Sequence, residues 1–230
     1  HFSDGTGNIY KEVWPLKSNG EVQSDKNFYK SLVTNKTQGV NNNIIKSFAE
    51  NMFNANDSEI QTIIENHMLL NQMLSYAVVD RAIRHDDGPF HWYCDWSKCE
   101  PHNFFWYENP STRKIHLIPW DLDNSFENII ENTNPVTPIA DDWGDTTNNC
   151  QIFNYGEWNI IQKSAACDKI VGGLARFEVE YQYLKDSLIN GPLAEQTVNL
   201  LIDQWVNQIR NATTDASQLH SDALNLTTWE

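Results

Sequence analysis

The segment 102–123 places the strongest constraint on how this chain can fold. An aromatic run, His102-Asn103-Phe104-Phe105-Trp106-Tyr107, is followed by a polar turn and then by Leu117-Ile118-Pro119-Trp120-Asp121-Leu122-Asp123. The turn between the runs contains Asn109, Pro110 and Ser111, which favour chain reversal. Two apolar runs that flank such a turn are typical of a β-hairpin, so we predict paired strands over 103–107 and 114–120.

The predicted exit strand ends in two acidic residues, Asp121 and Asp123. Residues two apart on a strand face the same side, so we expect both carboxylates to point to one place, where they would suit Mg²⁺. Another acid, Asp87, precedes Gly88, and Asn103 lies between these acids in the chain. The order acid, Asn, strand-borne acid is that of a kinase-type phosphoryl-transfer site. We predict that Asp87 positions the acceptor hydroxyl and that Asn103, Asp121 and Asp123 hold the metal.

Composition narrows the classes of partner. The 230 residues carry 16 Lys and Arg against 31 Asp and Glu, a net charge of −15, which repels nucleic-acid backbones. A basic protein or a metal-bridged nucleotide is the more natural partner. No apolar run approaches the ~20 residues that span a bilayer, so we expect no membrane span. The sequence does not indicate the oligomeric state.

Cysteines and glycosylation triplets favour an extracytoplasmic setting. Four cysteines, Cys94, Cys99, Cys150 and Cys167, permit two disulfides in three connectivities. The close spacing of Cys94 and Cys99 suits a local bridge, whereas free thiols or zinc are the alternatives; zinc is disfavoured because C-x₂-C spacing is absent. Asn-x-Ser/Thr triplets, which also arise by chance, begin at Asn35, Asn56, Asn211 and Asn225. We predict a secreted or cell-surface protein.

Elsewhere the periodicity is mainly helical. We predict a short strand over 9–14 and helices over 41–53, from 57 or 58 onward, over 68–84 until Gly88-Pro89, and over 168–189. Gly191 caps the last of these and Pro192 begins a further helix that runs to at least 209. Segment 127–150, with Asp141, Asp142 and Asp145, is expected to be a long loop.

These motifs together resemble those of the spore-coat CotH kinase family, secreted or surface proteins with an atypical protein-kinase-like fold. The residues that carry the resemblance are Asp86-Asp87-Gly88, the 102–107 run, Pro119-Trp120-Asp121-Leu122-Asp123, Asn8-Ile9-Tyr10-Lys11 and Leu201-Ile202-Asp203-Gln204-Trp205. The expected fold class is α+β: a mainly helical kinase C-lobe, residues 1–230, with a short hairpin at the active cleft. The N-terminal nucleotide-binding lobe of the family is expected to be largely absent from residues 1–230, either because they are a fragment or because the protein has lost that lobe.

The resemblance implies transfer of phosphate from ATP, with Mg²⁺ or Mn²⁺, to Ser or Thr of extracytoplasmic proteins. It implies Asp87 as the catalytic acid and Asp121 as the metal ligand, with Lys11 as the one candidate for a basic residue that binds the nucleotide. Fifteen residues separate Asp87 from Asn103, where ordinary kinases have roughly four. We interpret them as an inserted loop stapled by Cys94 and Cys99.

Simpler interpretations stay open. Asp121 and Asp123 would also suit a structural calcium or a hydrogen-bonded pair, and Asp87 would suit a turn or cap beside Gly88. The Trp residues at 92, 96, 106 and 120 are typical of a core, or of a surface that stacks on sugar or peptide. The alternative function is therefore a non-catalytic surface or adhesion module that keeps the kinase shell and binds a partner protein or glycan.

Overall fold

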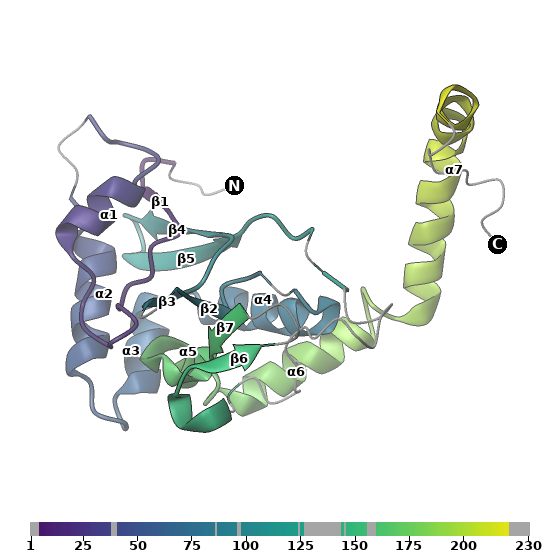
Figure 1. Ribbon diagram of the computed structural model, residues 1–230. Coiled ribbons are helices and arrows are strands. Elements are labelled where there is room, and N and C mark those ends of the chain that lie inside the picture. Colours follow the sequence, from purple (N-terminus) through teal and green to yellow (C-terminus); the bar gives the residue numbers. More distant parts are fainter. Residues whose placement is uncertain are drawn as a thin grey trace. The chain divides into compact units, whose positions relative to one another are not determined.

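The chain folds into a mixed α+β structure with two antiparallel sheets and several helices (Figure 1). The computed structural model describes residues 5–37, 41–85, 87–95, 98–123, 125–126, 144, 146–155 and 160–220. The chain divides into two units, His1–Leu184 and Lys185–Glu230. Both sheets and the predicted catalytic and metal-binding residues belong to the first unit, and the whole of the longest helix belongs to the second.

The first sheet contains the predicted hairpin. Its strands, in spatial order, are β1 (Ile9–Lys11), β4 (Phe104–Asn109) and β5 (Lys114–Pro119). In the hairpin Phe104 is paired with Pro119 and Asn109 with Lys114. The prediction of paired strands is therefore confirmed. The first strand begins one residue later than predicted and ends two residues later.

The second sheet was not predicted. Its strands, in spatial order, are β3 (Lys98–Glu100), β2 (Trp92–Asp95), β7 (Ile160–Lys163) and β6 (Phe153–Tyr155). The segment between Asp87 and Asn103, expected to be a loop, thus contributes two of these strands. Cys94 and Cys99 are paired directly across β2 and β3 and form a disulfide, which confirms the local bridge.

The described residues also form helices (Figure 1). They are α1 (Asp25–Ser31), α2 (Asn43–Asn54), α3 (Ile60–His67), α4 (Leu70–Ile83), α5 (Lys169–Leu174), α6 (Glu178–Ile189) and α7 (Glu195–Leu219), with short turns η2 (Thr147–Cys150) and η3 (Ala165–Cys167). Helices α2, α3 and α4 contact β5 and so cover the hairpin. Within the described ranges, none of the helices combines the length and apolar character needed to cross a membrane.

Two predicted helices are interrupted. The helix expected over 68–84 begins only at Leu70, because Met68 forms a parallel bridge with Ile115 of β5 and Leu69 donates its N–H to the Ile115 carbonyl. Pairing with the sheet competes here with helical periodicity and ends α3. The helix expected over 168–189 is likewise divided at 175–177. The structure also adds α1, whose first turn is capped by Ser24.

Trp14 joins the two sheets in the core. Its ring lies 5.7 Å from that of Trp92 on β2, and 5.5 and 5.4 Å from Phe104 and Trp106 on β4. All four side chains are buried. Edge-to-face aromatic pairs add stabilisation beyond the area they bury, so this cluster fixes β2 against β4.

A buried carboxylate, Glu108, anchors the amino-terminal strand. One oxygen accepts hydrogen bonds from Asn8 Nδ2 at 2.7 Å and from the Tyr10 hydroxyl at 2.9 Å. The other accepts from the backbone N–H of Ile45 at 2.8 Å, in the first turn of α2. Burial raises the pKa of Glu108, and these donors oppose that rise. Glu108 therefore holds both β1, through Asn8 and Tyr10, and α2, through Ile45, to the hairpin.

Asp168 is a second buried carboxylate that accepts backbone hydrogen bonds, at the start of α5. Its Oδ1 accepts hydrogen bonds from the N–H groups of Ile170 at 2.8 Å and Val171 at 3.1 Å. The disulfide between Cys150 and Cys167 lies next to it, which settles the second bridge. Burial raises the pKa of Asp168 to about 6, although these N–H groups favour the charged form.

This raised pKa predicts a specific pH dependence of stability. The folded protein holds the Asp168 proton more tightly than the unfolded chain, so stability present at low pH is lost as the pH rises from about 4 to about 6. Relative to Asp168→Asn, the wild type should lose up to about 3 kcal/mol of unfolding free energy over this range. Urea unfolding at several pH values measures the difference. Asp25→Asn is the control with opposite sign, because a hydrogen bond from Lys46 lowers the pKa of Asp25. A flat difference for Asp168→Asn would contradict the prediction.

Candidate functional site

The site begins where α4 ends. Arg84 adopts a left-handed backbone conformation (φ 53°) and terminates the helix, so the chain turns sharply before Asp87. Gly88 follows in a crowded position, since a Cβ there would lie 2.5 Å from His85 Nδ1 and 2.8 Å from Asp80 Oδ2. No residue with a side chain fits without displacing that pair. The glycine therefore lets the loop that bears Asp87 pack closely on α4.

Asn103 contacts Asp87 in two ways. Its Nδ2 donates to the Asp87 carbonyl at 2.8 Å and to the Asp87 carboxylate at 2.9 Å. Asn103 itself has a left-handed backbone (φ 56°), a conformation that Asn tolerates better than most residues. Because the amide nitrogen is used by Asp87, the amide oxygen is the atom of Asn103 suited to a cation. The structure thus brings Asp87 and Asn103 together across the fifteen residues between them.

Asp121 is connected to the same loop through His85. The buried His85 ring places Nε2 3.2 Å from the Asp121 carbonyl oxygen. A carbonyl can only accept, so Nε2 carries the hydrogen, and Nδ1, 3.2 Å from the Tyr76 hydroxyl, is left to accept in the neutral ring. Asp121 also has a left-handed backbone (φ 53°), and its side chain is exposed. His85 lies two residues before Asp87 in the chain, so this contact connects the Asp121 backbone to the loop that bears Asp87.

The strand-borne placement of Asp121 and Asp123 was wrong. Strand β5 ends at Pro119, and both acids lie in the turn that follows. Because Asp121 is left-handed, strand alternation does not apply to the pair. Asp123 is exposed and forms no hydrogen bond with a described residue. The segment returns at Phe126, whose N–H donates to the Ile83 carbonyl at 2.8 Å, so this turn is held against the end of α4.

A buried polar network around Asp80 lies next to the loop that bears Asp87. Asp80 Oδ2 lies 3.5 Å from His85 Nδ1, and Asp80 Oδ1 lies 3.4 Å from Arg81 Nε, which provides the compensating charge. His91, on the far side of Gly88, is buried beside them. Burial and the Arg81 charge lower the pKa of His91 to about 3, so it is neutral at physiological pH. A neutral imidazole leaves Arg81 as the counter-charge of Asp80.

Sequence reasoning missed two contributors. His85 precedes Asp87 with the spacing of His and Asp in the H-R-D motif of protein kinases, a signal that was available. Glu12 has no such signal: it is left-handed (φ 49°), and its Oε1 accepts from the Asn103 N–H at 3.2 Å. These two residues position Asp121 and Asn103 rather than add chemistry of their own.

The other predicted residues have varied surroundings. Lys11 is exposed on β1, adjacent in sequence to Glu12. His102 is exposed, with its ring 6.4 Å from Tyr93. Trp92 and Trp106 belong to the core, whereas Trp120 is 53% exposed next to Asp121. The predicted residues Asp86, Trp96, Asp141, Asp142, Asp145 and Asn225 lie outside the described residues.

The described sequons differ in their surroundings. Asn35 donates its Nδ2 to the Thr6 carbonyl and to Asn8 Oδ1, both at 3.0 Å. Asn56 is exposed, and its Oδ1 accepts from the Ser58 hydroxyl at 2.6 Å. Asn211 is exposed on α7. Glycosylation at these positions stays a prediction.

Comparison with known proteins agrees with these motifs. The family model described as CotH kinase protein matches residues 1–230. The chain belongs to the CotH kinase family. No curated protein matches the sequence. The resemblance inferred from Asp87, Asn103 and the Pro-Trp-Asp-Leu-Asp motif is therefore confirmed at the level of the family.

The described part of the CotH chain offers few protein ligands for a metal. Within the part of the chain that the structure describes, no three His, Cys, Asp or Glu side chains form a group that could hold an ion. Mg²⁺ in phosphoryl-transfer sites is bound through one or two carboxylates together with substrate phosphates and water. The exposed Asp121 carboxylate and the Asn103 amide oxygen are hard donors that fit such a site, with Asp123 two residues away.

The contact between Asn103 and Asp87 predicts a graded loss of stability. Asn103→Gly should remove both hydrogen bonds but tolerate the left-handed backbone. Asn103→Ala should lose the same bonds and add roughly 1–2 kcal/mol of backbone strain. Urea unfolding of both variants measures the difference between them. Equal stability of the two variants would show that the position relaxes to another backbone conformation.

Proposed function

We propose that this CotH-family chain is a protein kinase that transfers the γ-phosphate of ATP to Ser or Thr hydroxyls of extracytoplasmic proteins. The observation that carries the proposal is the joining of three dispersed residues at one loop. Asn103 holds the Asp87 carboxylate, and His85 holds the Asp121 backbone. The order of these residues along the chain is that of the catalytic acid, the Asn and the metal-binding acid of kinases.

In this proposal each side chain has one task. Asp87 orients the acceptor hydroxyl and accepts its proton as the new O–P bond forms and the bond between the γ-phosphorus and the β-phosphate oxygen breaks, which releases ADP. Asp121 and the Asn103 amide oxygen hold Mg²⁺ or Mn²⁺, with Asp123 as an added ligand. The bound cation supplies charge neutralisation for the phosphates. Lys11, beside Glu12 on β1, is proposed to contact the nucleotide.

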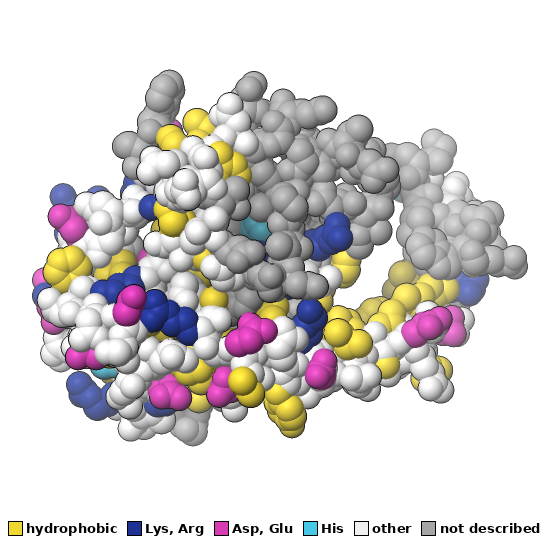
Figure 2. Space-filling model, turned by 90° about the horizontal axis from the view of Figure 1, so that it is seen from below, with side chains coloured by type: hydrophobic (Ala, Val, Ile, Leu, Met, Phe, Trp, Pro, Cys, Tyr) yellow, Lys and Arg dark blue, Asp and Glu magenta, His cyan; other side chains and the backbone are white. Residues whose placement is uncertain are grey.

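The setting of the site is consistent with secretion. Both disulfides, Cys94–Cys99 and Cys150–Cys167, are of the kind that persists in oxidising compartments. On the face shown in Figure 2, acidic and basic side chains are interspersed. Residues 1–230 would act as one kinase-like domain, with the substrate protein approaching over the disulfide-bonded β2–β3 hairpin.

The decisive variant is Asp121→Ala. In the full-length protein with Mg²⁺ or Mn²⁺, transfer of labelled phosphate from ATP to casein or histone should fall at least about 100-fold, because a metal ligand is lost. Asp186→Ala, which removes an exposed carboxylate on α6, is the control and should retain the wild-type rate. Unchanged labelling by Asp121→Ala would reject the kinase assignment, as would no labelling by the wild type with either metal.

A second candidate function is a surface or adhesion module with a kinase-like shell. Two exposed apolar side chains, Trp120 and Leu122, flank Asp121, with exposed fractions of 53% and 40%. The Trp120 ring is held edge-on to Phe105 at 5.7 Å. A rigid exposed aromatic is well suited to stack on a sugar or to anchor a protein partner.

The two functions separate in a binding experiment. On a glycan array, an adhesion module should keep its signal when Asp87→Ala and Asp121→Ala are combined, because no catalytic group is needed. The signal should fall about tenfold or more in Trp120→Ala, which removes the anchor. Loss of binding in the double variant, or no effect of Trp120→Ala, would count against the adhesion function.

A further inference from the structure

A small pocket on the second sheet is lined by three lysines. Its volume is about 280 Å³, and the three come from separate segments: Lys17 from the turn after β1, Lys163 from the end of β7 and Lys169 from the start of α5. The remaining lining residues are Ser18, Asn19, Gly20, Phe53, Trp92, Cys167 and Asp168. No part of the pocket belongs to the candidate kinase site.

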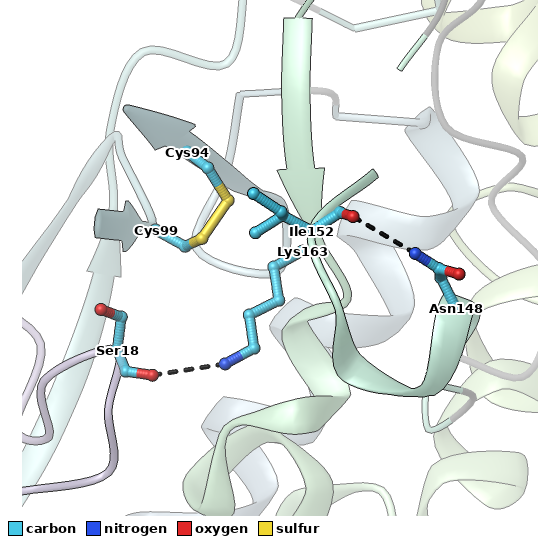
Figure 3. Close-up of a disulfide and its surroundings, with 6 residues drawn as sticks. All are labelled: Ser18, Cys94, Cys99, Asn148, Ile152 and Lys163. Atoms are coloured by element: carbon cyan, nitrogen blue, oxygen red, sulfur yellow. Dashed lines mark hydrogen bonds between the residues drawn. A yellow bond between two sulfur atoms is a disulfide. The ribbon is translucent and has the colours of Figure 1, made fainter. Parts of the chain in front are cut away.

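The ammonium groups are positioned by backbone oxygens. Figure 3 shows Lys163 reaching from β7 to the Ser18 carbonyl, at 3.3 Å. Lys169 donates to the carbonyls of Phe53, at 3.2 Å, and Ala55. Each lysine is half-buried, and an ammonium has three hydrogens, so donors remain on both. The lysine heads are thus fixed in place before any ligand arrives.

The charges of the lining are not balanced within the pocket. Three lysines and one acidic residue, Asp168, line the pocket. The Asp168 carboxylate accepts hydrogen bonds from the N–H groups of Ile170 and Val171, and the charge of Lys163 favours its ionised form. Lys17 has an ion-pair partner, Glu21, at 2.9 Å. Among the described residues, neither Lys163 nor Lys169 forms an ion pair. Such an excess of positive charge is unexpected in a chain with 16 basic and 31 acidic residues.

The walls are rigid. Cys167, in the wall, is bonded to Cys150, which ties the stretch between Lys163 and Lys169 to η2. Trp92 is buried against Trp14. A site whose groups are already held in place loses little conformational entropy when it binds, so weak individual contacts suffice for affinity.

We propose that this pocket binds a phosphate monoester group, carried by a small molecule or by a protein side chain. Lysines on three separate segments suit a tetrahedral oxyanion with several acceptor oxygens, whereas planar carboxylates are better matched by the fork of an arginine. The volume, about 280 Å³, is just below the usual range of small-molecule pockets, which begins at roughly 300 Å³. It therefore fits one phosphate group with a short substituent rather than a nucleoside triphosphate.

The pocket is separated from the candidate kinase site by the aromatic core. Trp92 lines the pocket and packs on Trp14, and Trp14 packs in turn on Phe104, which follows Asn103. Binding at the pocket therefore does not require Asp87 or Asp121. The proposal stands or falls independently of phosphoryl transfer.

Isothermal titration of the full chain at about 0.15 M ionic strength tests the proposal. The ligands are inorganic phosphate and O-phosphoserine, with acetate as the carboxylate control. We expect phosphate or phosphoserine to bind and Lys163→Gln to weaken that binding about tenfold or more, because a charged donor is lost. Lys98→Gln removes the same charge from an exposed position on β3 and should bind as the wild type does.

The outcomes separate the sources of the phosphate. Equal binding of both ligands supports recognition of the phosphate group alone, as on a small molecule, and preference for phosphoserine supports a modified side chain. Lys163→Arg, which keeps the charge, should restore most of the affinity and guards against misfolding of the glutamine variant. Equal effects of Lys163→Gln and Lys98→Gln, or acetate binding as tightly as phosphate, would overturn the proposal, and so would no binding by the wild type.

Discussion

The pair of hydrogen bonds between Asn103 and Asp87 is the contact on which the arrangement of the candidate site depends. It joins the two ends of the fifteen-residue excursion between Asp87 and Asn103, so the start of β4 is held against the end of α4. His85 makes the corresponding connection to Asp121. With both connections in place, three segments meet: the loop that bears Asp87, the residue before β4 and the turn after β5. Asp87, Asn103 and Asp121 all lie outside the helices and strands.

Left-handed backbone conformations recur at this meeting point. Glu12, Arg84, Asn103 and Asp121 all have positive φ values. Non-glycine residues in this conformation cost roughly 1–2 kcal/mol each and persist where surrounding contacts determine them. At Asn103 those contacts are the bonds to Asp87 and Glu12, and at Asp121 the bond from His85. Tertiary contacts thus maintain local conformations that the chain alone would not favour.

The sequence predicted those parts of the fold that depend on residues close together in the chain. The β4–β5 hairpin follows from its turn residues, and the Cys94–Cys99 bridge from close spacing. The pairing of β2 with β7 joins segments about seventy residues apart, and no short-range pattern encodes such a contact. Met68 shows the same effect, because a bridge to Ile115 interrupted a periodic helix.

The residues of the candidate site were predictable in identity but not in placement. Acids, an asparagine and their order along the chain were visible as motifs. The alternation rule failed for Asp121, because the strand ends at Pro119 and the backbone reverses hand two residues later. The supporting groups Glu12 and Asp80 are recognised only from their contacts, since neither stands in a motif.

The base contact at Asn103 also bears on how such chains diverge. The excursion that it closes carries its own hairpin and its own covalent crosslink (Figure 3). Insertions or deletions beyond that crosslink would leave the two ends of the excursion where they are. Changes in the length of this hairpin would therefore leave the contact between Asn103 and Asp87 in place, and with it the arrangement of the candidate site.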